Sequence, residues 1–325
     1  MSLDADLIVD RRRMRRKLTF WRVLAVLIAI AAIVGVAASV AKRGGGMTAG
    51  SDYIARIKIT GLIRNDQDRV ESLEKLAKAT TAKAVIVHID SPGGTTAGSE
   101  QLHDALRGVA AAKPLVVVVD GLAASGGYIA AMSADHIVAQ ETSLVGSIGV
   151  LFQFPNFTDV LKTVGVKVEE IKSSPLKAAP NGYEPTSPEA RAAIEALVKD
   201  SYAWFRGMVK DRRKMDDSML ETVTDGRVFT GRQGVNLKLV DELGNEKTAI
   251  AWLTKEKGLK ADTPVRDWEL KPRFGDLSIL HLTAALALEA VGANALAQRV
   301  EAWGSLQAVE KLNLDGLLAL WHPSL

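Results

Sequence analysis

The stretch KPLVVVVDGLAASGGYIAAMSAD, Lys113 to Asp135, decides the fold. A run of β-branched residues ends at Asp120, a turn of small residues follows, and Ser125 stands directly before two glycines and a helix-forming segment. β-Branched residues favour strands, and paired glycines permit a tight turn into a helix. The Ser125 hydroxyl is therefore predicted where a buried strand meets a helix N-terminus, which carries backbone N–H groups without intrahelical acceptors.

Strand and helix patterns alternate around this stretch. Strands are predicted for YIARIKITG, AVIVHID, PLVVVVD and HIVAQ, and helices for DRVESLEKLAKA, AGSEQLHDALRGVAAA and the long amphipathic SPEARAAIEALVKDSYAWFRGMVKDRRK. Strands this continuously apolar are buried on both faces of a sheet, so we expect an α/β domain with mainly parallel pairing. VIVHIDSPGG and VVVVDGLAASGG both run from a buried strand through Asp and serine to paired glycines that open a helix. This repeat predicts two glycine turns at one edge of the sheet.

Composition excludes several classes of function. The chain has 325 residues, of which 47% are hydrophobic, and a net charge of +3. Much of the basic excess lies in RRRMRRK, residues 11–17, so the rest of the chain offers little for nucleic acid to bind. The absence of cysteine rules out disulfides, thiol nucleophiles and thiolate metal sites.

An apolar run, FWRVLAVLIAIAAIVGVAASVAK, follows the basic block. About 20 such residues form a helix of roughly 30 Å, the thickness of a bilayer core, so a transmembrane helix is predicted over residues 20–41. A cleaved signal peptide is the alternative. The bias of lysine and arginine places the N-terminus in the cytoplasm and the rest of the chain outside it.

A serine nucleophile needs a base, and histidine is the usual one. None of the five histidines lies in a motif that resembles a catalytic turn; His88 is expected to be a satisfied core residue and His103 to face solvent from a helix. The other candidate is Lys177 in EEIKSSPLKAAP, since a lysine held in an apolar pocket becomes a neutral amine more readily. Alternatively, Ser125 is an N-cap or a small packing residue, and Lys177 is simply solvated.

The Ser-x-x-Lys spacing in SSPLK also occurs in penicillin-recognising serine enzymes. The same spacing recurs at Ser39/Lys42 and Ser72/Lys75, and the companion motifs SDN and KTG are absent. The spacing therefore carries no weight.

Five motifs, taken together and in order, are specific enough to indicate a protein family. IDSPGG, AASGGYIAAMSAD, GSIGV, IKSSPLK and DGRVFTGRQGVNLKLVDELG, in this order, resemble the signal peptide peptidase A family, membrane-anchored serine–lysine proteases of the ClpP/crotonase fold. The resemblance covers roughly residues 53–253. It departs from the family at KSSPLKAAP, which lacks the glycine and the acidic residue that commonly flank the base.

The resemblance implies a role for each matching residue. Ser125 would be the nucleophile, Lys177 the general base and Ser147 the hydroxyl that hydrogen-bonds the lysine amine. The oxyanion donors would be the backbone N–H of Gly126 and that of Gly93 or Gly94.

The implied activity is that of a serine endopeptidase bound to the inner membrane, which cleaves remnant signal peptides and other hydrophobic peptides on the extracytoplasmic side. No metal or other cofactor is expected, and the resemblance implies a homo-oligomeric ring or dome. The alternatives are an acyl-CoA-binding crotonase-like enzyme, which would need neither a membrane anchor nor Lys177, and a non-catalytic membrane scaffold. The expected organisation is a basic cytoplasmic segment (1–19), the transmembrane helix (20–41), a glycine-rich tether (42–52), the catalytic domain (53–261) and an apolar tail (262–325).

The tail contains LSILHLTAALALEAVGANALA, residues 277–297. We expect it to dock as an amphipathic helix on a neighbouring subunit or on the membrane surface near the active-site cleft. A second membrane span is the alternative, made costly by His281 and Glu289.

Overall fold

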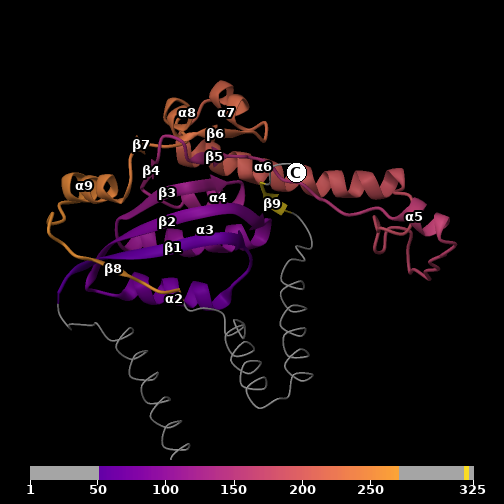
Figure 1. Cartoon of the computed structure of the whole chain (residues 1–325), viewed down its shortest axis with the longest axis horizontal. Coiled ribbons are helices and arrows are strands. Elements are labelled where there is room, and N and C mark those ends of the chain that lie inside the picture. The colour runs from indigo at the N-terminus through magenta and orange to yellow at the C-terminus, as the bar shows by residue number, and fades with distance from the viewer. Residues whose placement is uncertain (1–50, 271–317, 322–325) are drawn as a thin grey trace, which may run out of the picture. The chain divides into compact units, whose positions relative to one another are not determined.

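The computed structural model describes residues 51–270 and 318–321 (Figure 1). Its helices are α2 (Gln67–Lys78), α3 (Thr96–Ala112), α4 (Gly126–Ala131), α5 (Thr158–Thr163), α6 (Pro188–Arg213), α7 (Asp217–Val223), α8 (Gly231–Asn236) and α9 (Glu246–Lys257). Its strands are β1 (Tyr53–Ile63), β2 (Ala82–Thr95), β3 (Leu115–Ala124), β4 (His136–Ala139), β5 (Leu144–Gly146), β6 (Val228–Thr230), β7 (Glu242–Leu243), β8 (Val265–Asp267) and β9 (Leu318–Leu320).

These strands form one sheet in the order β6-β5-β3-β2-β1-β8; β4 joins β3 and β7, and β9 joins β2. Pairing is parallel between β1 and β2, β2 and β3, β3 and β5, and at β4 and β8. The described pairs β5–β6 and β2–β9 are antiparallel. The prediction of a mainly parallel α/β sheet is confirmed.

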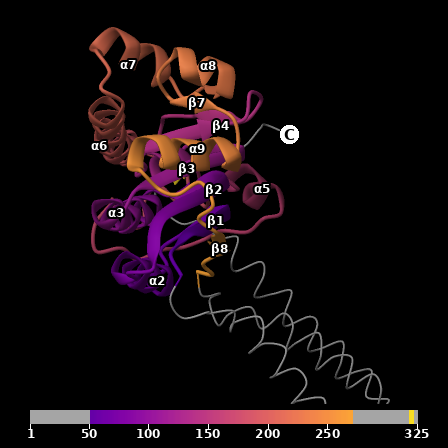
Figure 2. The ribbon, with the colours of Figure 1, turned by 90° about the vertical axis from the view of Figure 1, so that its left-hand side faces the viewer.

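Both faces of the sheet are buried, as its apolar strands predict. Alternate residues such as Val85 and Val117 lie on one face with side chains of α2, α3, α4 and α6. Their neighbours Ile86 and Val116 lie on the other face, against Ala249 and Leu253 of α9. Figure 2 shows α2, α3 and α6 together on the left of the strands. Period-two side-chain alternation thus builds two cores from one set of strands.

Both glycine turns are present at the carboxyl ends of neighbouring strands, as the repeat predicts. β2 runs through Gly93 and Gly94 into α3, and β3 runs through Ser125 into α4. A Cβ on Gly94 would lie 1.8 Å from the Ile63 carbonyl oxygen, and one on Gly127 would lie 2.5 Å from that of Ser91. The two turns are therefore packed backbone against backbone and admit only glycine there.

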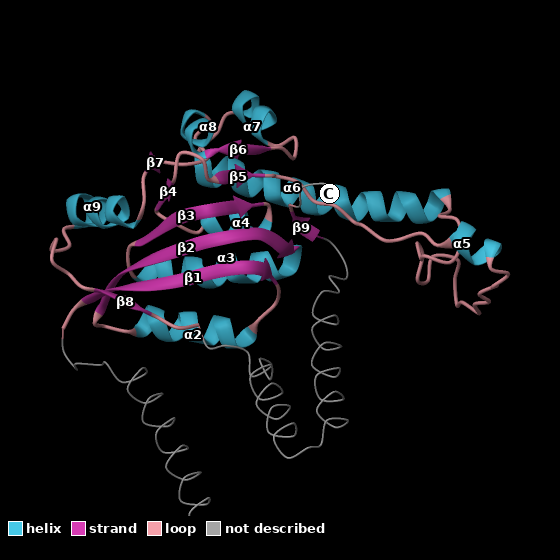
Figure 3. Cartoon of the chain, viewed as in Figure 1, coloured by secondary structure: helices cyan, strands magenta, loops and turns pink. Residues whose placement is uncertain are grey.

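Residues 151–187, which we call the arm, differ from the sheet. They lead away from the sheet to α5, and α6 runs back beside them (Figure 3). No side chain in this range is buried, and apolar residues such as Phe157, Val160, Val164 and Ile171 are exposed.

The remaining expectations have different outcomes. β8 extends the sheet beyond residue 261, where we expected the catalytic domain to end. The expectation that His103 faces solvent is wrong, because its side chain lies on the buried side of α3. The predicted transmembrane helix (20–41) and tail residues 271–317 lie outside the described residues. Over residues 51–270 and 318–321, no helix combines the length and apolar character that a bilayer crossing requires.

Candidate active site

Ser125 occupies the turn between β3 and α4 in an unusual conformation. Its φ and ψ are 53° and −116°, and it is 1% exposed. It holds the N-cap position of α4, but its hydroxyl accepts no helix N–H, whereas Thr95 caps α3 with its side chain. A non-glycine residue at positive φ costs free energy and persists only where the surroundings enforce it. The alternative that Ser125 is a capping hydroxyl is therefore wrong.

The first oxyanion candidate lies directly after this serine. Gly126 is the first residue of α4, so its N–H belongs to the helix turn whose N–H groups have no intrahelical acceptor. An N–H adjacent to a nucleophile at a helix N-terminus is well placed to stabilise developing negative charge.

The second turn distinguishes the other two candidates. The Gly93 N–H donates to Ser91 Oγ at 3.1 Å, and Ser91 Oγ in turn donates to the Gly61 carbonyl at 2.7 Å. On the side of β2 that faces β9, the Pro92 carbonyl accepts a hydrogen bond from the N–H of Trp321, the residue directly after β9. Groups two residues apart point to the same side of a strand, so the Gly94 N–H faces this side as well. Gly94 is therefore the better oxyanion candidate.

Ser147 lies next to Ser125 through the backbone. The Ser125 N–H donates to the Gly146 carbonyl at 2.8 Å, and Ser147 follows with φ 51° and its own N–H bonded to the Arg227 carbonyl at 2.8 Å. Ser147 is 8% exposed. Neither hydroxyl has a hydrogen-bond partner among the described side chains and backbone. The structure thus brings together Ser125, Ser147, Gly126 and the Gly93–Gly94 turn.

Lys177 is not brought into this group. It lies on the arm, exposed, and its amine has no ion-pair or hydrogen-bond partner among residues 51–270 and 318–321. The other lysine of the motif, Lys172, bonds the carboxylates of Glu170 and Glu184 at 2.6 Å each. The hydrogen bond that Lys172 donates to Glu170, followed by the one it donates to Glu184, raises the pKa of Lys172. The two lysines are therefore chemically distinct, and only Lys177 is left without a carboxylate.

The described histidines are engaged elsewhere. His88 lies between Asp120 and Glu246, with ring-nitrogen contacts of 2.9 and 2.8 Å, which confirms the expectation of a satisfied residue. His103 contacts Asp104, and His136 contacts Glu242 while stacking on Trp252. In the part of the chain that the structure describes, no cluster of acidic and histidine side chains could hold a metal ion.

A slot for one extended strand runs past the glycine turn, and sequence reasoning missed it. β9 fills it: Leu318, Ala319 and Leu320 pair antiparallel with Thr95, Gly94 and Gly93. On its other edge, Leu318 exchanges two hydrogen bonds with Leu151, at 3.0 and 3.1 Å. β9 also lies beside α4, the helix that Ser125 opens. The only sequence signal is the short apolar run LLALW between Gly316 and Pro323.

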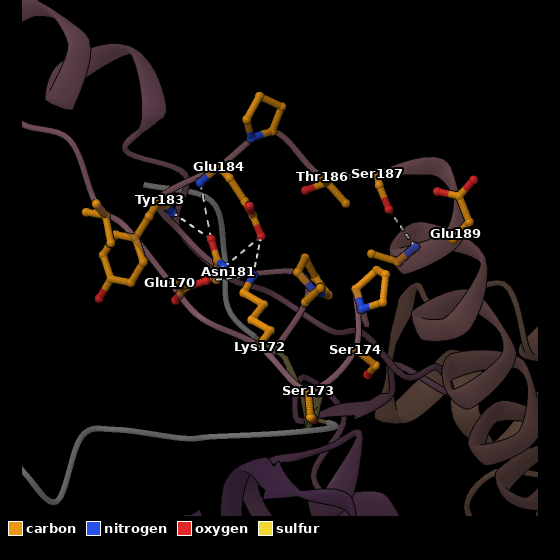
Figure 4. Close-up of a pocket in the computed structure, with 16 residues that line it drawn as sticks. Glu170, Lys172, Ser173, Ser174, Asn181, Tyr183, Glu184, Thr186, Ser187 and Glu189 are labelled. Carbon is orange, nitrogen blue, oxygen red and sulfur yellow. Dashed lines mark hydrogen bonds and ion pairs between the residues drawn. The ribbon is translucent and has the colours of Figure 1, made fainter. Parts of the chain in front are cut away.

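A hollow in the described surface lies elsewhere. It has a volume of about 640 Å³ and is lined by arm residues around Lys172 and by the start of α6 (Figure 4). Asn181 and Tyr183 line it beside the Lys172–Glu184 pair, and it contains neither Ser125 nor Ser147. Its polar lining holds the arm together and offers no nucleophile poised beside an oxyanion hole.

Comparison with known proteins agrees with this geometry. The profile of Peptidase family S49 matches residues 107–260, and that of Clp protease matches residues 55–143. A candidate protease of Synechocystis sp. is 35% identical over 210 residues, which cover 64% of this chain and 76% of that protein. A candidate signal peptide peptidase SppA of Enterococcus faecium is 31% identical over 62% of this chain and 59% of its own length. The chloroplastic serine protease SPPA of Arabidopsis thaliana is 30% identical over 65% of this chain but only 33% of its own length.

Proposed function

The chain belongs to peptidase family S49 and is a serine protease with an α/β fold of the Clp type; from this premise we propose that Ser125 and Lys177 form its catalytic dyad. The observation that carries the proposal is the Ser125 turn. A buried hydroxyl held at positive φ, unused as a cap and adjacent to the N-terminal N–H of α4, is placed to attack a carbonyl.

The chemistry assigned to the dyad is acyl transfer. The neutral Lys177 amine takes the Ser125 proton as Oγ attacks the peptide carbonyl carbon, and the oxyanion is held by the N–H groups of Gly126 and Gly94. The resulting ammonium returns the proton to the leaving amine nitrogen when the peptide bond breaks. Water, deprotonated by the same amine, then hydrolyses the Ser125 ester. Ser147, which directly follows the Gly146 carbonyl that accepts the Ser125 N–H, is assigned the role of positioning the amine.

Because a single chain leaves Lys177 on the arm, we propose that the lysine reaches Ser125 from a second copy of the chain in a ring. The exposed apolar residues of the arm support this arrangement, since they are unburied in one copy. Lys172 is excluded as the base because its two carboxylate partners hold it as an ammonium.

The substrates proposed are hydrophobic peptides, including remnant signal peptides, on the extracytoplasmic side of the inner membrane. The apolar run over residues 20–41 and the basic block before it support membrane attachment. No cofactor is needed, since the acyl transfer uses only side chains and backbone N–H groups.

The test compares Ser125→Ala, Lys177→Ala and Lys172→Ala on an apolar peptide substrate. We expect the first two to lower kcat/KM by about 10⁴-fold or more, because members of a catalytic unit fail together. Lys172→Ala should retain far more activity than Ser125→Ala or Lys177→Ala. Near-wild-type hydrolysis by Lys177→Ala would rule out the dyad.

A mixing experiment tests the second-copy arrangement. Assemblies formed from Ser125→Ala and Lys177→Ala chains together should recover part of the activity, since some interfaces then combine an intact serine with an intact lysine. No recovery after verified mixing would place the lysine in the same chain as its serine.

A further inference from the structure

We propose that the edge of the sheet at which its parallel strands begin docks on anionic phospholipid headgroups of the membrane to which the chain is attached. The proposal rests on the membrane attachment in the proposed function, and it names the surface and the lipid class that the catalytic domain contacts. We call this surface the basic edge. It consists of Lys75, Lys78, Lys83, Lys113, Lys255, Lys257, Lys260 and Arg266.

The parallel topology of the sheet assembles the basic edge. β1, β2 and β3 run in the same direction, so their first residues lie at one edge. β8 joins β1 in parallel at this edge, where the Ile54 N–H donates to the Pro264 carbonyl at 2.9 Å. The helices α2, α3 and α9 precede β2, β3 and β8, so their carboxyl ends come to this edge as well. In Figure 3 the arrows of β1, β2 and β3 point toward β9 and away from the loop that joins α9 to β8.

Side-chain contacts bring cations of different elements together at this edge. Lys113, directly after α3, donates from Nζ to the Leu76 and Ala79 carbonyls at the end of α2, at 2.7 Å each. Burial, followed by the charge of nearby Lys83 at the start of β2, lowers the pKa of Lys113. Like charges held close together repel each other, and such a surface is complementary to a partner of opposite charge.

The positive charge of the basic edge is not matched by carboxylates. Residues 51–270 contain 28 Lys and Arg against 30 Asp and Glu, so the domain as a whole is slightly acidic. Five carboxylates lie at this edge beside the eight cations: Asp52, which pairs with Lys83 at 3.3 Å, Glu74, Asp135, Glu256 and Asp262. Within residues 51–270 and 318–321, four of the cations have no carboxylate partner, namely Lys75, Lys78, Lys257 and Lys260. Positive charge is therefore concentrated at one edge of an otherwise acidic domain.

The chain enters the domain at the same edge. The proposed membrane segment ends at residue 41, and β1 begins at Tyr53. Residues 42–52 cannot span more than roughly 40 Å even when fully extended. The basic edge is thus the part of the domain that the chain itself keeps closest to the bilayer, and this tethering gives it a high effective concentration at the headgroups.

Two aromatic side chains accompany the cations. The Arg266 guanidinium lies 5.1 Å from the centre of the Tyr53 ring, and the Lys257 amine lies 5.2 Å from that of Trp252. Tyrosine and tryptophan are enriched where proteins meet the headgroup region, because their rings combine an apolar body with a polar tip. Lysine and arginine beside them are attracted to anionic headgroups. This combination favours a lipid surface over a free phosphate ion.

Docking of the basic edge fixes the height of the active site above the bilayer. β3 runs from Leu115 at this edge to Ala124, directly before Ser125. A strand of this length spans roughly 30 Å. Peptide bonds inside the bilayer are then out of reach of Ser125, so the proposed hydrophobic substrates are cleaved after they leave the membrane.

Because the sequence has no cysteine, a single introduced thiol can report docking in the full-length chain. Thr80→Cys places a fluorophore at an exposed position of the basic edge, and Asn65→Cys places it at an exposed position before α2, near the opposite edge. The 12 residues of α2 separate the two sites by about 18 Å. Each labelled chain is reconstituted into nanodiscs of phosphatidylcholine, with or without phosphatidylglycerol, that carry a nitroxide quencher on a lipid headgroup.

We expect phosphatidylglycerol to increase quenching of the Thr80→Cys label about threefold or more and to leave the Asn65→Cys label unchanged. About 1 M NaCl, which shortens the Debye length to about 3 Å, should abolish the difference.

Two double variants test the lysines themselves. Each lysine near an anionic surface changes the docking equilibrium about fivefold, so Lys78→Gln/Lys83→Gln should weaken docking about tenfold or more. Lys58→Gln/Lys247→Gln removes the same charge from exposed positions in β1 and at the start of α9, and it is the matched control. The control should dock within about twofold of the parent.

Equal quenching of the Thr80→Cys label in both lipid compositions would overturn the proposal, and so would equal losses in the two double variants. Displacement of the edge by inorganic phosphate at constant ionic strength would show a site for a free anion instead. A chain that does not co-purify with either kind of nanodisc refutes the membrane attachment itself. A chain that co-purifies without lipid-dependent quenching refutes only the basic edge, and hydrolysis of a soluble peptide by the same samples tests the protease assignment separately.

Discussion

The turn around Ser125 and the arm around Lys177 are built in opposite ways. The turn lies at the edge of a sheet buried on both faces, where glycines contact neighbouring backbone and each conformation is fixed by several hydrogen bonds. The arm has no buried side chain and is held by surface ion pairs such as Lys172–Glu184. Exposed ion pairs contribute little, about 0–1 kcal/mol each.

This difference is the reason that we propose a two-part catalytic site that depends on assembly. A close-packed turn can hold a nucleophile and an oxyanion donor in one chain, because packing over-determines its geometry. An exposed segment cannot position a base to the same degree by itself. The described residues of one copy, 51–270 and 318–321, do not hold the Lys177 amine, which is why we propose that the arm lies at an interface.

The largest expected effect breaks the turn itself. Gly94→Ala puts a methyl group 1.8 Å from the Ile63 carbonyl oxygen, so β1 and β2 must separate. We expect a loss of about 3 kcal/mol in the free energy of unfolding and loss of peptide hydrolysis. Denaturant unfolding measures the first effect.

Gly108→Ala is the matched control, because no atom lies within 4 Å of the added Cβ and Gly108 lies in the interior of α3. It should stabilise the protein by about 0.5–1 kcal/mol. If both variants unfold at the same denaturant concentration, the close contact at Gly94 does not contribute to the stability of the fold.

An intermediate effect is expected on the arm. Ile171→Asp changes a fully exposed apolar side chain, so the free energy of unfolding of the single chain should change by less than about 0.5 kcal/mol. Assembly should nevertheless weaken, and hydrolysis should fall by about tenfold or more, since about 1.4 kcal/mol at an interface is a tenfold change in affinity. Sedimentation velocity measures assembly, and an activity assay measures hydrolysis. Ile171→Val is the control, and retention of both assembly and activity by Ile171→Asp would remove the arm from the interface.

The smallest expected effect is a difference in pH dependence between the helices packed on the sheet and the arm. Burial lowers the pKa of His103, with Arg212 and Arg107 adding to the shift and Asp104 opposing it. The unfolded chain therefore binds more protons than the folded one below the ordinary histidine value of 6.5, so stability falls as the pH drops through that value. The arm carboxylate Glu184 has its pKa lowered by Lys172, so its ion pair persists until the pH is below 4.5.

Thermal unfolding between pH 7 and 5 should accordingly report on the sheet and its helices rather than on the arm. His103→Phe, which cannot titrate, should flatten this part of the stability curve. A wild-type stability curve that is already flat from pH 7 to 5 would show that the pKa of His103 is the same in the folded and unfolded protein, which contradicts its burial.

Much of the fold was predictable, because it is encoded in short-range patterns. Continuous apolar strands alternating with amphipathic helices predicted the parallel sheet, and the two glycine repeats predicted turns at one edge. The position of Ser125 followed from the same local pattern. The motif order also identified the family before the fold was known.

Other features were not predictable for identifiable reasons. His103 was placed on the wrong side of α3, because one polar residue does not reveal which stripe of a helix packs against its neighbours. β8 extends the sheet through only three residues, too few for a periodic signal. Sequence also gave no reason to expect that Lys172 is paired with two carboxylates and Lys177 with none.

Local sequence patterns predicted the groups that we assign to the chemistry: a serine at a strand-to-helix turn, glycines that leave backbone N–H groups beside it, and a lysine in a loop. These follow from local conformational preferences, which operate over a few residues. Which groups meet depends on long-range pairing, because contacts between Leu318 and Leu151, or between Ser125 and Gly146, join positions that are separated along the chain. Long-range backbone pairing put the C-terminal strand in the slot and left Lys177 outside it, and neither outcome is written in a local pattern.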